Sequence, residues 1–193
     1  MTGMDALPPD LQSLWDQMDA ADRAADGLSE RLSDEEFFWA PDEGRRWSVA
    51  LCLDHLAVTN AVYGAAMREA LDRARARGLT RTGPLAPGFF GRKFAESQEP
   101  PVKRRSSAPG KIQPRPSRGR GEILTAYHDA HDLIRGIIRD AATVDANRAT
   151  FRNPFVGLLK VKVSSALYII AAHDRRHLWQ AEQVERALAA ART

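Results

Sequence analysis

The chain has 193 residues, of which 44% are hydrophobic and 27% are charged, as in an ordinary soluble globular protein. One domain spanning residues 1–193 is long enough to bury a substantial core. Charged residues interrupt every apolar run before the roughly 20 residues that a membrane span needs, so we expect no transmembrane helix and no membrane partner. The polar start of the chain lacks the apolar segment of a secretory signal, which favours a cytoplasmic location.

The net charge of +3 is concentrated in one segment, residues 100–120, which holds seven basic residues and no acidic one. Subtracting these seven cations from +3 leaves −4 on the rest of the chain. A segment of this composition could contact nucleic acid or an acidic partner. It has no aromatic side chain on which bases could stack, so nucleic-acid binding is not favoured. The seven cations are Lys103, Arg104, Arg105, Lys111, Arg115, Arg118 and Arg120.

Four segments carry apolar residues at every third or fourth position, which predicts four amphipathic helices. They cover residues 10–32, 48–77, 122–142 and about 158–190. Ser48 is the predicted N-cap of the second helix, and Gly78 is its predicted end. Because no convincing strand pattern occurs, the sequence predicts an all-α four-helix bundle.

The connections between these helices differ in character. After the first helix, Ser33 offers a new helix start within a packed connector. Residues 79–120, between the second and third helices, are rich in proline and glycine and are predicted to form a long loop. Its first part is expected to dock on the bundle through Leu85, Phe89, Phe90 and Phe94. Its second part, residues 100–120, has too little apolar surface to order itself and is predicted to be disordered.

Three histidines on predicted helices form a candidate metal site. His173 and His177 are four residues apart, so they lie one turn apart on the same helix face, within an apolar stripe. His55 lies on a similar stripe of the second helix. Three neutral imidazoles could hold a divalent metal and leave one coordination position open. The alternative is a set of buried histidines bonded to other polar groups of the chain.

Other residues near these histidines have several candidate roles. Asp54 and Asp174 are adjacent in sequence to predicted ligands and could orient an imidazole. Arg176 could bind a carboxylate of a ligand or pair with a protein carboxylate such as Asp54, and we favour the pairing. His131 could be a fourth ligand, a general base, or a buried histidine bonded to a carbonyl, and we favour the last. The single cysteine, Cys52, is interpreted as a small buried residue rather than a catalytic thiol.

Zinc-protease chemistry is not expected. On a helix with two histidines at this spacing, the zinc proteases carry a glutamate base directly after the first histidine, and here Asp174 follows His173. None of the candidate residues is therefore assigned a catalytic role from the residues alone.

Several of these segments together resemble a known family. Trp47-Ser48 precedes the inward His55, the run Phe151-Arg152-Asn153-Pro154-Phe155-Val156-Gly157 follows the third helix, and the last helix contains His173-Asp174-Arg175-Arg176-His177-Leu178-Trp179-Gln180. In this combination the chain closely resembles the DinB/YfiT-like superfamily over about residues 10–188. The basic, proline-rich insert is a departure from the family pattern.

The resemblance implies a four-helix bundle with up-down-down-up connectivity and frequent homodimerisation. It also implies a divalent metal on His55, His173 and His177, which is zinc or nickel, or in some members iron or manganese. Some relatives are thiol-dependent S-transferases or isomerases that use bacillithiol, mycothiol or glutathione, and many have no known reaction.

Two functions follow as expectations. The first is a metal-dependent S-transferase or hydrolase in which the metal activates a low-molecular-weight thiol toward a small electrophile, so that no protein nucleophile is needed. The second is a non-catalytic metal-binding or interaction protein whose basic segment, residues 100–120, contacts nucleic acid or an acidic partner. We favour the first because the histidines belong to the body of the fold.

Overall fold

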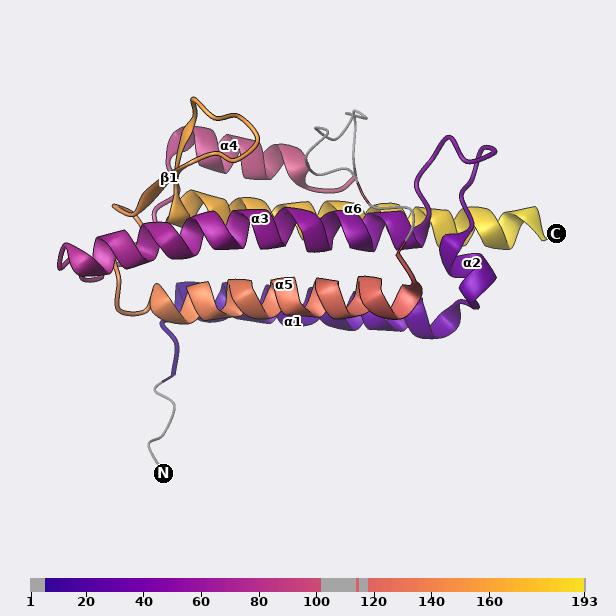
Figure 1. Cartoon of the computed structure of the whole chain (residues 1–193), viewed down its shortest axis with the longest axis horizontal. Helices are drawn as coiled ribbons and strands as arrows, with labels where there is room; N and C mark the ends of the chain where they lie inside the picture. The colour runs from indigo at the N-terminus through magenta and orange to yellow at the C-terminus, as the bar shows by residue number, and fades with distance from the viewer. Residues whose placement is uncertain (1–5, 102–113, 115–117, 193) are drawn as a thin grey trace.

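Four long helices make up the body of the protein, which is described here by a computed structural model covering residues 6–101, 114 and 118–192. They are α1 (Pro9–Arg31), α3 (Val49–Ala76), α5 (Arg120–Asp140) and α6 (Val163–Ala191). In Figure 1, α1 and α6 run in one direction and α3 and α5 in the other, which gives up-down-down-up connectivity. The predicted all-α four-helix bundle is thus confirmed.

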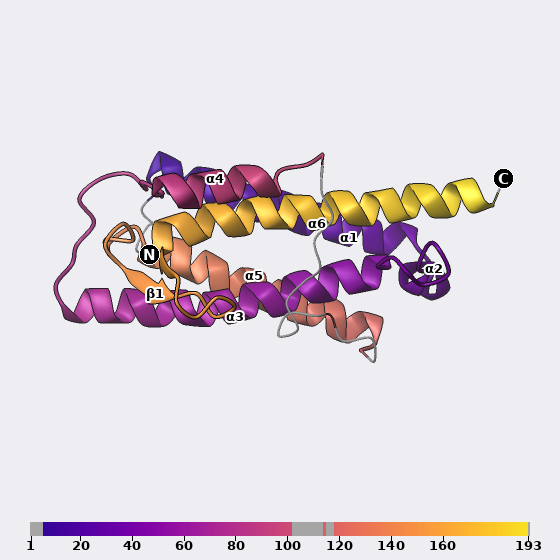
Figure 2. The ribbon, with the colours of Figure 1, turned by 90° about the horizontal axis from the view of Figure 1, so that it is seen from above.

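The remaining elements are short and lie in the connections. They are α2 (Asp34–Phe38), α4 (Phe89–Gln98), and the antiparallel strands β1 (Thr150–Arg152) and β2 (Lys160–Lys162). α4 lies along α6, as Figure 2 shows from above. The hairpin of β1 and β2 precedes α6 directly.

The helix starts follow from local capping. The Ser48 hydroxyl accepts a hydrogen bond from the Leu51 amide at 3.1 Å, so Ser48 is the N-cap of α3, as predicted. Ser33 and Glu36 form a capping box at the start of α2, which satisfies two amides of that short helix. α3 ends just before Gly78, whose φ of +67° is a conformation that favours glycine.

The core is divided into two apolar clusters with a buried polar layer between them. One cluster includes Met67 on α3, Ile134 on α5 and Ile170 on α6. The other includes Leu53 on α3 and Leu178 on α6. Buried polar side chains lie at intermediate positions of these helices: Asp54, His55, Thr59, Asn60, His131, Asp174 and His177. This layer contains His55 and His177, two of the three histidines of the candidate site.

α3 is also apolar enough, by length and composition, to cross a membrane, with a mean hydropathy of 1.3 in its most apolar window. However, 67% of that window is buried inside the bundle. It therefore has the burial of a core helix of the bundle, and its length and composition are only weak evidence for a membrane span.

The segment predicted as a loop after α3 contains the helix α4, and its phenylalanines do not dock. Phe89, Phe90 and Phe94 are 61%, 85% and 52% exposed. α4 instead packs closely on α6 at small residues. A Cβ added at Gly91 would lie only 2.5 Å from the Ser165 side chain. The close approach of the two backbones turns the bulky side chains outward. Of the four expected apolar anchors, Leu85 alone is buried.

The last helix begins later than predicted. Residues 158–162 belong to the hairpin, in which Phe151 pairs with Val161 and Arg152 with Lys160. The Asn153 side chain accepts hydrogen bonds from the amides of Phe155 and Val156, which turns the chain there and prevents an earlier helix. These strands were missed because three-residue strands are too short to show an alternating pattern.

Most of the predicted disordered segment, residues 102–113 and 115–117, lies outside the described residues. Arg118 and Arg120 are described, and both bind the bundle. Arg118 Nη1 donates to Asp54 Oδ1 at 2.7 Å, and Arg120 Nη1 donates to the Leu32 carbonyl and to the Asp34 carboxylate, each at 2.9 Å. These two cations therefore belong to the folded body rather than to a solvated arm.

The contact between α3 and α5 gives a test of this packing. A Cβ added at Gly64 would lie 2.5 Å from Leu133 Cδ2, so Gly64→Ala should overpack the interface and lower the free energy of unfolding by about 1–3 kcal/mol in urea titration. The matched control is Gly121→Ala in α5, where a Cβ meets nothing within 4 Å. That change should be neutral or stabilise by up to about 1 kcal/mol. Equal effects of the two substitutions would contradict the close approach of α3 and α5.

Candidate metal centre

His55 on α3 and His173 and His177 on α6 meet between the two helices. One ring nitrogen of each lies within 4.8 Å of the others, and His55 Nε2 is 3.3 Å from His173 Nε2. His55 and His177 are buried, while His173 is partly exposed. The structure thus brings together the three residues that the sequence predicted as ligands.

These side chains fit a divalent transition-metal ion. Nitrogens bound to tetrahedral zinc at about 2.0–2.1 Å are separated by about 3.3–3.4 Å, which is the separation of His55 Nε2 and His173 Nε2. The Nδ1 atoms of His173 and His177 are buried and have no hydrogen-bond partner among the described residues. Imidazole nitrogen is a suitable donor for zinc, copper, iron and nickel.

Burial keeps two of these imidazoles, those of His173 and His177, in the neutral form that binds a metal. It lowers the pKa of His173 to about 3, with smaller contributions from the charges of His55 and Arg176. It lowers the pKa of His177 even further, again helped by neighbouring positive charge from His173, His55 and Arg176. Both rings therefore carry a free lone pair at neutral pH.

Trp47 covers one side of the histidine group. Its ring centroid lies 4.9 Å from that of His55 and 5.6 Å from that of His177, on which it stacks at an interplanar angle of 26°. Sequence reasoning did not assign Trp47 to the site. The available signal was its position directly before Ser48, the N-cap of the helix that carries His55. The indole shields the two imidazoles from water on this side.

Two charged residues next to the ligands have partners other than those expected. Asp54 is completely buried and forms its ion pair with Arg118, which occupies the position that we expected for Arg176. Arg176 Nη1 lies 3.5 Å from the Gln98 amide oxygen at the end of α4, and burial lowers the pKa of Arg176. The positive charge of Arg176 is nevertheless close enough to His173 and His177 to act on their pKa values.

Asp174 points into the polar layer of the core. Its Oδ1 accepts a hydrogen bond from Asn60 Nδ2 at 2.9 Å, and its Oδ2 lies 3.5 Å from His131 Nε2. Burial raises the pKa of Asp174, although the charge of His131 and the Asn60 hydrogen bond oppose this shift. Neither of these contacts is made with one of the three candidate ligands.

His131 is fully buried between two carboxylates. Its Nδ1 lies 2.7 Å from Asp22 Oδ1 on α1, opposite its contact with Asp174, and the Tyr127 ring packs 4.2 Å from the His131 ring. Burial alone would raise the pKa of Asp22, but hydrogen bonds and charges from His131 and Arg135 lower it below its ordinary value. The expected bond from His131 to a carbonyl is thus replaced by contacts with carboxylates, and the partner Asp22 was missed.

Two other residues, His128 and Cys52, lie outside the centre. The His128 side chain is 38% exposed and its Nε2 lies 2.9 Å from Asp26 Oδ1, as suits a boundary residue. Cys52 is fully buried, which raises the pKa of its thiol and leaves it without contact to solvent. This agrees with its interpretation as a small buried residue.

The buried histidines predict an acid-sensitive fold for the metal-free protein. Between pH 6.5, the ordinary pKa of histidine, and about 3, the unfolded chain binds protons at His173 that the folded chain does not. The free energy of unfolding should therefore decrease as the pH is lowered through this window, by at most about 1.4 kcal/mol per pH unit for each such histidine. Urea titrations in a chelator at several pH values would measure this slope. His173→Gln should reduce this slope, and an unchanged slope in His173→Gln would argue against a His173 imidazole that the fold keeps neutral.

Comparison with known proteins identifies the family. A sequence profile of the DinB superfamily matches residues 17–181, a range that contains all three histidines. No curated protein and no solved structure matches the chain significantly. Because the profile spans most of the chain and the helices have the expected arrangement, the protein belongs to the DinB superfamily.

Proposed function

We propose that the protein is a metal-dependent S-transferase that holds a divalent ion on His55, His173 and His177 and acts on a low-molecular-weight thiol and a small electrophile. The observation that carries the proposal is the convergence of three imidazoles from α3 and α6, of which burial keeps His173 and His177 neutral. Zinc and nickel are the ions we propose, because the family resemblance suggests them and both accept imidazole nitrogen.

An ion held by three neutral ligands would keep its full positive charge, and at its open position this charge would favour the ionised form of a thiol. The chain supplies the surroundings for that chemistry. Trp47 excludes water from one side of His55 and His177, and Arg176 adds positive charge beside His173 and His177, which favours a substrate with an anionic group.

The nucleophile would come from the cosubstrate. Cys52 is the single cysteine of the chain, and it is fully buried with a raised thiol pKa. A reaction that proceeds through a thiol therefore requires an external one, and glutathione, mycothiol and bacillithiol are the candidates that relatives suggest.

Metal analysis tests the first part of the proposal. The purified protein should contain about one divalent ion per chain by elemental analysis. Replacing His55, His173 or His177 by Ala should each weaken metal affinity by more than the roughly 10- to 100-fold that loss of a supporting hydrogen bond to a ligand costs. His128→Ala is the control and should retain the metal. Full occupancy in His173→Ala would show that the metal lies elsewhere.

A thiol-transfer assay separates the enzyme from the alternative, an interaction protein with a basic arm. The five cations outside the described residues, Lys103, Arg104, Arg105, Lys111 and Arg115, can be changed together to Gln. For an enzyme, this variant should keep most of its transfer from glutathione, mycothiol or bacillithiol to chlorodinitrobenzene, and His177→Ala should lose at least about 100-fold. For a polyanion-binding protein, the five-residue variant should lose DNA affinity and its salt dependence, whereas His177→Ala should bind normally. Absence of transfer with all three thiols would leave the alternative as the better account.

A further inference from the structure

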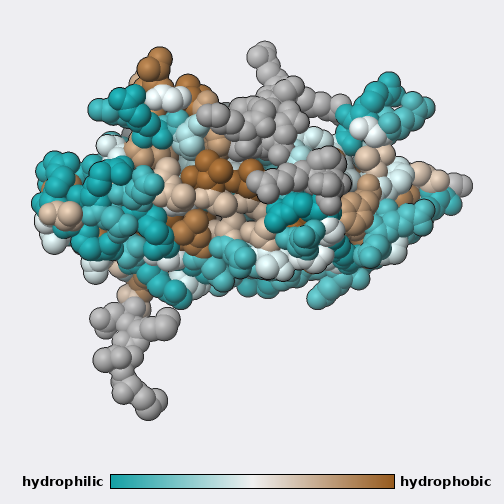
Figure 3. Space-filling view, viewed as in Figure 1, coloured by the Kyte–Doolittle hydropathy of each residue, from teal (hydrophilic) through white to brown (hydrophobic). Residues whose placement is uncertain are grey.

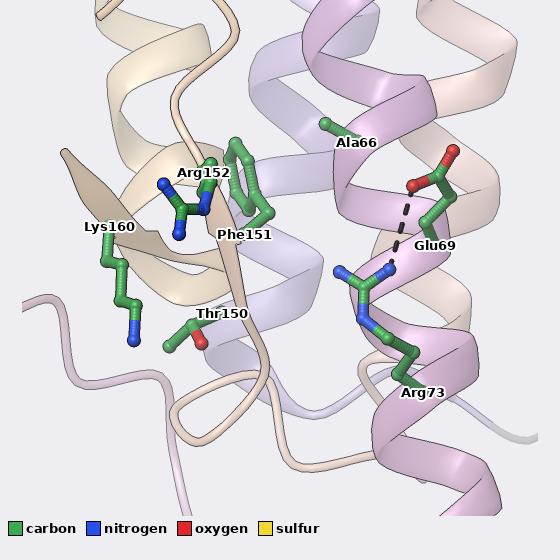
Figure 4. Close-up of a pocket in the computed structure, with 7 residues that line it drawn as sticks. All are labelled: Ala66, Glu69, Arg73, Thr150, Phe151, Arg152 and Lys160. Atoms are coloured by element: carbon green, nitrogen blue, oxygen red, sulfur yellow. Dashed lines mark ion pairs between the residues drawn. The ribbon is translucent and has the colours of Figure 1, made fainter. Parts of the chain in front are cut away.

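A cleft of about 370 Å³ opens between α3 and the β1–β2 hairpin, on a part of the surface that the metal centre does not use (Figure 4). Glu69, one of its lining residues, follows His55 by 14 positions on α3, which places it about 21 Å farther along the helix axis. The volume lies within the range of about 300–1,000 Å³ typical of small-molecule sites. The cleft is therefore large enough for a ligand and separate from the histidines.

Positive charge dominates the lining. Figure 4 shows Arg152 and Lys160 on the hairpin side of the cleft and Glu69 and Arg73 on α3. Arg73 Nη1 lies 3.6 Å from Glu69 Oε2, so the one carboxylate of the lining is already paired. Arg152 and Lys160 form no ion pair with any residue in the described part of the chain. Three cations and one carboxylate give the cleft a formal charge of +2.

The two cations of the hairpin, Arg152 and Lys160, repel each other when no anion lies between them. Arg152 and Lys160 are paired directly across the ladder of β1 and β2, so their side chains lie on the same face of the hairpin. Like charges in this relation repel each other and destabilise a two-stranded ladder. A bound anion between them would convert this repulsion into two charge-assisted hydrogen bonds.

The inner part of the cleft is apolar and firmly held. Phe151 is 5% exposed and its ring stands edge-on to Tyr63, at a centroid distance of 5.8 Å. Ala66 lines the α3 side beside it. The Asn153 amide donates to the Tyr63 hydroxyl at 2.7 Å and so ties the hairpin to α3. An apolar group can lie against Phe151 and Ala66 while an anionic group reaches the cations at the rim.

We propose that this cleft binds a phosphate monoester with an apolar body, its phosphate held by Arg152 and Lys160 and its body packed on Phe151 and Ala66. A phosphate monoester carries about −1.5 to −2 charges at neutral pH, which matches the charge of the lining, whereas a carboxylate balances only half of it. The ester could be a soluble metabolite or the headgroup of an anionic lipid. The second source is chemically reasonable because Leu158 and Leu159, at the hydrophobic hairpin tip visible in Figure 3, are 94% and 52% exposed.

Calorimetric titration of the full-length protein with phenyl phosphate, inorganic phosphate and benzoate tests the site. Phenyl phosphate should bind most tightly, since it alone satisfies both the cations and the apolar floor. The double variant Arg152→Ala/Lys160→Ala should lose at least about tenfold in affinity for it. Lys162→Ala is the matched control, because it removes one exposed cation of the same strand outside the lining and should change affinity by less than about threefold. Glu69→Gln should raise the affinity, because it removes the competing carboxylate.

Vesicle sedimentation distinguishes the two sources of the ester. Binding to phosphatidic acid vesicles but not to phosphatidylcholine vesicles, lost in the double variant, would identify a lipid headgroup. Binding of phenyl phosphate without vesicle binding would identify a soluble ligand. The exposed positions of Arg152 and Lys160 allow the variant to fold, and its helical circular dichroism and metal content should match the parent. The proposal is overturned if phenyl phosphate does not bind at millimolar concentration. It is also overturned if the double variant keeps the affinity of the parent, or if Lys162→Ala weakens binding as much as the double variant does.

Discussion

The meeting of three imidazoles, two of them buried and one partly exposed, between α3 and α6 is the constraint on which the rest of the centre depends. A charged imidazole in this position would lack solvent, so burial lowers the pKa values of His173 and His177, and a neutral ring retains the lone pair that a metal needs. Burial also requires side chains that cover the imidazoles. Trp47 supplies one of them, and the two long helices hold the nitrogens within 4.8 Å of one another without help from a loop. Imidazoles held in this way are rigid, and they add no negative charge to the centre.

A second buried contact chain sets how the four helices meet at this level. The contacts run from Asp22 on α1 to His131 on α5, then to Asp174 on α6 and finally to Asn60 on α3. Each long helix therefore contributes one residue. A buried ionic contact is costly to break when only one partner is lost, which makes the chain sensitive to rotation or sliding of any helix. Asp174 directly follows His173 on α6. The contacts of Asp174 therefore also fix the direction in which His173 and His177 point.

The sequence was sufficient for those features that a helical period determines. The spacing of His173 and His177, and the stripe that carries His55, predicted the helices, the bundle and the meeting of these side chains, because a fixed geometry of 3.6 residues per turn connects position to direction. Features that depend on contacts between distant parts of the chain were missed or predicted wrongly. The three phenylalanines of α4 suggested an apolar docking face, yet Gly91 made the contact with α6. Arg118 took the expected place of Arg176, and Asp22 was recruited from a helix more than 100 positions from His131.

The contacts around the centre separate two tasks within the fold. The bundle helices hold the histidines, whereas Trp47, Gln98 and Arg118, which surround or support them, come from the segments before α3, at the end of α4 and before α5. Glu99 adds a further tie, because its carboxylate binds Arg175 on α6 at 2.5 and 3.0 Å. The segment between α3 and α5 is thus attached, on both sides of its undescribed part, to the helices that carry the ligands. Connections vary more readily than packed helices, so a metal site can be retained while its surroundings change. The family and the three histidines are compatible with metal binding, and under the proposed function the residues of these connections are where the choice of substrate is to be sought.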